Sequence, residues 1–173
     1  MNRTNHRRTG FTLVEMIAAT AIMAMLTTSS FALVRTANDA WRRHQGDSQQ
    51  RREAIAALQH VVRRVRQANQ VTAISTAADM SGFITLQMAD GTAALWDHDG
   101  AMGQVLYGTV TPNNLLAEGI TQMNFTGLTA NGLTQTIDVT KIHGVRCTVT
   151  YALTRPTGST TETVSCLAWL RAW

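Results

Sequence analysis

An unbroken run of apolar residues follows a short polar amino terminus. Residues 11–34 read FTLVEMIAATAIMAMLTTSSFALV, in which Glu15 is the one ionisable side chain. A helix of this length rises roughly 36 Å, enough to cross a hydrocarbon core of about 30 Å. A secretory signal peptide has a shorter apolar stretch, usually about 7 to 15 residues. We therefore predict a transmembrane helix over residues 11–35.

Residues 36–70 have the pattern of an amphipathic helix that continues the first one. They contain no proline, are rich in Ala, Gln and Arg, and repeat apolar side chains at steps of three and four. The expected apolar stripe consists of Ile55, Leu58, Val62 and Val65, with Trp41 and Ala68 roughly in phase. Such a stripe is expected to pack on a sheet.

From residue 75 onward, short strand-like runs alternate with Gly, Asp and Asn, which is typical of strands joined by turns. The predicted strands are residues 83–88, 93–96 and 104–107, with weaker candidates at 120–125 and 137–140. A connector at 75–82 and turns at 89–92 and 97–100 separate them. Residues 75–173 are therefore expected to form a β-rich head.

A closing hairpin gives the clearest strand signal. Apolar and polar residues alternate over residues 145–151 and again over 164–170, with a turn at 155–158. A symmetric register about that turn places Cys147 opposite Cys166, with both side chains on one face. The patterns together predict an α+β protein, with a long amino-terminal helix packed on a mainly antiparallel head.

The net charge of +4 is distributed unevenly. The three arginines before residue 11 and the excess of arginine in residues 35–66 contrast with an acidic remainder. An arginine-rich helix face can bind anionic lipid or nucleic acid, but such faces are more often solvated or paired with adjacent subunits. No aromatic residues are interleaved to stack bases with the arginines of this face, so we expect no nucleic-acid partner; these are Arg51, Arg52, Arg63, Arg64 and Arg66.

Glu15 is the residue that hydropathy does not explain. A carboxylate in an apolar helix costs about 2.5 to 3.5 kcal/mol near the bilayer centre unless it is compensated. One interpretation places Glu15 near the headgroups, within reach of water. The other pairs Glu15 with a positive charge from another copy or another subunit.

Residues 7–16, RRTGFTLVEM, resemble the cleavage and methylation site of type IV pilins and type II secretion pseudopilins. The resemblance implies a pilin-like fold and a leader over residues 1–10. It also implies cleavage by a prepilin peptidase between Gly10 and Phe11, followed by N-methylation of Phe11. In this family the matching glutamate, here Glu15, neutralises the terminal amine of a neighbouring subunit during assembly.

Leader removal has a direct electrostatic consequence. It deletes three arginines, lowers the net charge to about +1 and creates an amine at Phe11, one helical turn before Glu15. Between axially shifted helices, this amine and the carboxylate of Glu15 would fix the stagger of the subunits.

Three segments resemble the minor pseudopilin J of type II secretion more loosely: residues 57–68, 115–125 and 141–149. The resemblance implies a single-pass inner-membrane subunit with its head in the periplasm and no enzymatic activity. Its expected partners are other minor and major pseudopilins and membrane lipid, with a secreted protein as a further candidate. A minor type IV pilin for adhesion, motility or DNA uptake is the alternative, and a membrane-anchored binding protein or enzyme is less favoured.

Other candidate chemistry is sparse. Asp97 and Asp99 are weak candidates for a calcium site, because calcium needs six to eight oxygen ligands, and a simple turn is favoured. No cofactor or catalytic motif is recognisable, so we expect neither. In an oxidising compartment Cys147 and Cys166 could form a disulfide; the alternative is two reduced cysteines acting as small apolar residues.

Overall fold

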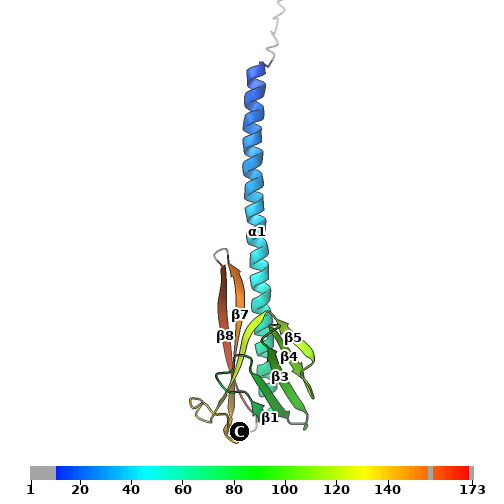
Figure 1. The fold of residues 1–173 in the computed structure, drawn as a ribbon, viewed down its shortest axis with the longest axis vertical. Coiled ribbons are helices and arrows are strands. Elements are labelled where there is room, and N and C mark those ends of the chain that lie inside the picture. The colour runs from blue at the N-terminus through cyan, green and yellow to red at the C-terminus, as the bar shows by residue number, and fades with distance from the viewer. Residues whose placement is uncertain (1–10, 156–157, 172–173) are drawn as a thin grey trace, which may run out of the picture. The chain divides into compact units, whose positions relative to one another are not determined.

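The computed structural model describes residues 11–155 and 158–171 (Figure 1). The chain divides into two compact units. The first ends at Arg42 and the second begins at Arg43. One long helix, α1 (Leu13–Val65), is followed by two antiparallel sheets. The predicted α+β class is therefore confirmed.

The first unit contains the amino-terminal part of α1, whose side chains are exposed from residue 11 to residue 42. By length and composition α1 is able to cross a membrane. Its hydroxyl groups bond within the helix: Thr27 donates to the Met23 carbonyl at 2.9 Å and Ser29 to the Met25 carbonyl at 2.8 Å. These bonds satisfy polar side chains that would otherwise be costly in lipid.

In the second unit the larger sheet has the strand order β1-β2-β3-β4-β5. Its strands are β1 (Ala68–Ile74), β2 (Phe83–Met88), β3 (Ala93–Asp99), β4 (Gln104–Gly108) and β5 (Asn114–Glu118). The smaller sheet, in the order β6-β7-β8, consists of β6 (Ile120–Leu128), β7 (Gly144–Arg155) and β8 (Gly158–Trp169). A short 3-10 helix, η1 (Val139–Lys141), lies between β6 and β7.

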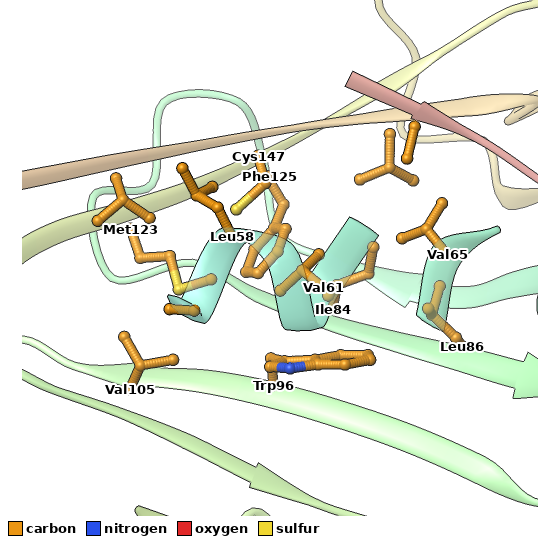
Figure 2. Close-up of a cluster of buried hydrophobic side chains, with 14 of the residues drawn as sticks. Leu58, Val61, Val65, Ile84, Leu86, Trp96, Val105, Met123, Phe125 and Cys147 are labelled. Carbon is orange, nitrogen blue, oxygen red and sulfur yellow. The ribbon is translucent and has the colours of Figure 1, made fainter. Parts of the chain in front are cut away.

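The core forms where the last turns of α1 meet both sheets, as Figure 2 shows. One group of buried side chains comes from the five-stranded sheet: Ile84, Leu86, Trp96 and Val105. A second group comes from the three-stranded sheet: Met123, Phe125, Cys147 and Val149. The carboxyl-terminal part of α1 is thus covered from two sides.

The buried face of α1 differs from the predicted stripe. Leu58 and Val65 are buried as expected, but Ile55 is 36% exposed. In its place Ala54 and Ala57 are fully buried. A helix between two sheets needs small side chains where the backbones approach closely, and a pattern weighted toward large apolar residues does not identify them.

Trp41 and Ala68 do not join this stripe either. Trp41 is 64% exposed, and Ala68 is buried in β1 instead of in the helix. The helix ends at Val65, so the prediction of helix to residue 70 is wrong. Val71, Thr72 and Ile74 favour an extended chain, and the pairing of this segment with β2 outweighs its helical propensity.

Residues 97–99 belong to β3, so the prediction of a turn at 97–100 is also wrong. The turn begins at residue 100, and Gly103, with a φ of 63°, ends it. The side chain of His98 is 3% exposed, and its Nε2 lies 3.0 Å from the Ile120 carbonyl. The strand continues to Asp99 because β3 pairs with β4, in which His98 lies opposite Val105 and Asp99 opposite Gln104.

The weak strand at 137–140 is replaced by η1, for which the Asp138 side chain accepts a hydrogen bond from the Thr140 amide. The predicted hairpin register is confirmed: Cys147 pairs with Cys166 and Val149 with Val164. The centre of the turn, residues 156–157, lies outside the described residues.

Candidate functional site

The first turn of α1 contains a reciprocal set of hydrogen bonds between Thr12 and Glu15. The backbone amide of Thr12 donates to Oε2 of Glu15 at 2.9 Å, and the Thr12 hydroxyl donates to the same oxygen at 3.0 Å. In return the Glu15 amide donates to Oγ1 of Thr12 at 3.3 Å. Because the helix begins at Leu13, this arrangement is a capping box.

The capping box fixes the position of the carboxylate. Both Thr12 donors use Oε2, which leaves Oε1 of Glu15 without a hydrogen-bond partner among residues 11–155 and 158–171. A carboxylate in the first turn is also favoured by the helix dipole. Glu15 is therefore held by its own chain through one oxygen and can accept an external cation through the other.

Thr12 is a site residue that the sequence analysis missed. The signal was present, since a Thr followed three residues later by Glu and an apolar run is the sequence signature of a capping box. The adjoining Phe11 is 85% exposed, and Gly10 lies outside the described residues. Cleavage between Gly10 and Phe11 and methylation of Phe11 stay predictions.

The two cysteines lie opposite each other and are both free thiols in the structure. Burial raises the pKa of Cys147 well above its usual value. A hydrogen bond from Cys147 lowers the pKa of the half-buried Cys166, with a smaller contribution from Arg66. The pair is thus chemically unequal, and the disulfide between them stays a prediction.

The structure does not bring Asp97 and Asp99 into a recognisable metal site. Oδ1 of Asp99 accepts hydrogen bonds from the amides of Ala101 at 2.9 Å and Met102 at 3.1 Å, which stabilises the turn after β3. Asp97 lies within β3, paired with Phe83 and Leu106. Within the described part of the chain, no group of three or more His, Cys, Asp or Glu could hold a metal ion.

The segment around the capping box can be compared with known proteins. Residues 5–31 match the family model for the prokaryotic N-terminal methylation motif. The methylation motif therefore includes Gly10, Phe11, Thr12 and Glu15. No curated protein and no solved structure matches the chain.

The methylation motif supports a subunit of the type IV pilin-like or pseudopilin type. Together with the long apolar helix, it fits the membrane anchoring of a pilin-like protein. The match ends at residue 31, so it carries no information about the head.

Proposed function

We propose that the chain is a minor pseudopilin, a non-enzymatic assembly subunit of a type II secretion pseudopilus. A prepilin peptidase removes residues 1–10, and the new terminal Phe11 is N-methylated. The helix anchors the subunit in the inner membrane with its head in the periplasm. On assembly, Glu15 pairs with the terminal amine of a neighbouring subunit, and the subunit then leaves the bilayer with the fibre.

The capping box is the observation that carries this proposal. Its hydrogen bonds hold the Glu15 carboxylate in a fixed orientation at the first helical turn and leave Oε1 able to bind a partner. In a low-dielectric setting a pair between this oxygen and a cationic amine is much stronger than in water. An unpaired carboxylate there is costly, so pairing favours helices at one defined axial offset.

The head supports a role in recognition. The last turns of α1 pack between two sheets and belong to the same compact unit as the head, which gives partners a folded surface on which to assemble. The resemblance of residues 57–68, 115–125 and 141–149 to minor pseudopilin J favours partners among the other minor and major pseudopilins. A secreted protein is a further candidate partner.

The first experiment examines the amino terminus of the protein purified from its native membrane. Mass spectrometry is expected to find a chain that begins at N-methylated Phe11. Gly10→Ala is expected to abolish or sharply slow leader removal, because the peptidase site requires a residue without a side chain. A native chain that retains residues 1–10 would refute the proposed processing.

The second experiment tests the role of Glu15. Glu15→Ala should still insert into the membrane but copurify less with partner pseudopilins after crosslinking in cells. Asp39→Asn, which removes an exposed carboxylate farther along the same helix, serves as the control. Equal copurification of wild type and Glu15→Ala would contradict the pairing role, and crosslinks to pilus components instead of secretion components would favour the minor type IV pilin.

A further inference from the structure

A groove of about 630 Å³ lies in the second unit between the last turns of α1 and strand β8. Its apolar part is formed by Ile55, Leu58 and Val62 from the helix and by Val164 and Cys166 from the strand. Ile55 and Val62 belong to the stripe that the sequence predicts to pack on a sheet. In the structure the three-stranded sheet ends at β8, and Ile55 and Val62 are left incompletely covered.

The edge of the sheet beside this groove is open. Among the described strands β8 pairs with β7 alone, over twelve residues and without a register shift. Exposed edges are usually protected by bulges, lysine, proline or short length. The other sheet follows this rule, since β1 has register shifts and β5 has five residues. The β8 edge contains neither lysine nor proline.

The rim of the groove is positively charged. Arg63 and Arg66 line it, and both are exposed without an ion pair among the residues that the structure describes. No carboxylate lines the groove. The occupant should therefore combine apolar side chains, which cover Ile55 and Val62, with acidic ones that reach the arginines.

We propose that this groove binds an extended segment of an acidic partner protein, which adds to the β8 edge as a fourth strand of the smaller sheet. The backbone of the added strand would pair with β8, and its inward side chains would cover Ile55 and Val62. Its carboxylates would meet Arg63 and Arg66. The proposal concerns the head alone and does not depend on cleavage or on assembly of a fibre.

The length of the groove sets the length of the segment. The lining residues extend from Ile55 in α1 to Gln67, two residues past the end of the helix, which corresponds to about 18 Å at the helical rise. A strand rises about 3.3 Å per residue, so about five to six residues occupy the groove. The partner therefore contributes a short linear segment to the groove and not the surface of a folded domain.

Charge argues against a second copy of this chain as the occupant. Antiparallel pairing of two β8 edges would bring the arginine rims of both copies together. β8 itself contains one acidic residue, Glu162, which does not line the groove. Like charges at close range oppose such a pair, so the partner is a different, acidic polypeptide.

The test uses the full chain in nanodiscs and a fluorescently labelled peptide, ETVTVTE. When extended, this peptide presents Glu, Val, Val and Glu on one face. The comparison peptide, KTVTVTK, has the same apolar residues and the opposite charge. Fluorescence anisotropy measures binding, and empty nanodiscs provide the blank.

The wild-type chain is expected to bind the acidic peptide roughly tenfold more tightly than the lysine peptide, as two exposed charge pairs suggest. The double variant Arg63→Glu/Arg66→Glu should reverse this preference. Arg51→Glu/Arg52→Glu, which changes the total charge equally outside the groove, should keep it. Equal binding of both peptides, or a preference that survives Arg63→Glu/Arg66→Glu, would overturn the proposal.

Strand addition is tested through the peptide backbone. A strand pairs through one edge, so N-methylation of the two valines or of the three threonines blocks opposite edges of the peptide. One of these methylated peptides should lose binding while the other retains it. If both bind as well as the unmodified peptide, the segment does not add to β8 as a strand.

Discussion

The indole Nε1 of Trp96 donates a hydrogen bond of 3.2 Å to Nδ1 of His60, which links β3 to α1. The two rings meet edge to face, with their centroids 5.7 Å apart. Nδ1 can accept this bond while it is unprotonated. Burial lowers the pKa of His60, and the charges of Arg64 and Arg63 lower it further. The folded head therefore favours the neutral imidazole.

This contact predicts that the head loses stability in mild acid. The pKa of His60 is lower in the folded chain than its value of about 6.5 in the unfolded chain, so the unfolded chain takes up the proton first. The contribution to stability is full above about pH 6.5 and falls as the pH drops through that value toward the folded pKa. His60→Gln keeps an acceptor and removes the titration, so it should flatten this part of the profile.

Thermal unfolding of the full chain in detergent, followed by near-ultraviolet circular dichroism from pH 7.5 to 5.5, measures the effect. His44→Gln removes an exposed imidazole from the same helix and serves as the control. A His60→Gln variant whose melting temperature depends on pH as steeply as that of the wild type would show that His60 does not cause the loss.

The capping box predicts that Thr12 orders the first turn of α1. Thr12→Ala removes the hydroxyl, which donates to Glu15 and accepts from its amide. Loss of such a cap usually costs about 0.5 to 2 kcal/mol. Amide hydrogen exchange at Leu13 to Met16 should accelerate in Thr12→Ala, while Thr12→Ser should stay close to wild type.

Thr12→Ala and Thr12→Ser also test whether order in the first turn of α1 affects assembly with partner subunits. If Oε2 of Glu15 must be held by Thr12 for Oε1 to meet a neighbouring amine, Thr12→Ala should also reduce crosslinking to partner subunits. Unchanged amide exchange in Thr12→Ala would mean that the hydrogen bonds of the capping box do not stabilise the turn.

The sequence predicts features that depend on local periodicity. The hairpin register of Cys147 and Cys166 is correct because both strands alternate regularly on either side of one turn. The burial of Ala54 and Ala57 was missed because it depends on a second sheet that approaches α1 from another side. The burial of His98 was also missed, since its Nε2 contacts the carbonyl of Ile120, 22 residues away. Such non-local contacts leave no periodic signal.

Substitution of glycine by alanine is expected to have opposite effects on stability at Gly127 and at Gly46. A Cβ on Gly127 would lie 2.6 Å from the Thr136 carbonyl oxygen and 2.7 Å from Cδ1 of Ile142. Gly127→Ala should therefore destabilise the head by about 1 to 3 kcal/mol. Gly46 lies within α1 with nothing near its Cβ position, so Gly46→Ala should stabilise the helix by about 0.5 to 1 kcal/mol.

Thermal unfolding of the two variants in the same detergent tests this contrast. A lower melting temperature is expected for Gly127→Ala, and an equal or higher one for Gly46→Ala. A neutral Gly127→Ala would mean that the loop containing Thr136 moves away from β6 without loss of stability.

The unequal cysteines predict the order of disulfide formation in oxidised glutathione. The thiolate of Cys166, which has the lower pKa, attacks the glutathione disulfide and releases one glutathione thiolate. Cys147 then loses its proton and displaces the second glutathione. The product has lost two hydrogen atoms, and two glutathione thiols are formed. Closing this loop should stabilise the head by about 3 kcal/mol.

Single substitutions of the two cysteines test whether Cys166 reacts before Cys147. Cys147→Ser should accumulate the mixed disulfide on Cys166, because no second thiol can displace the glutathione. Cys166→Ser should react slowly, because Cys147 is buried and its pKa is raised. Intact mass spectrometry follows all three chains over time. If Cys166→Ser forms a mixed disulfide as fast as Cys147→Ser, burial does not protect Cys147. If the wild type keeps both thiols in excess oxidised glutathione, the β7–β8 ladder holds the two sulfurs in a geometry that cannot close, and the reduced pair is the native state.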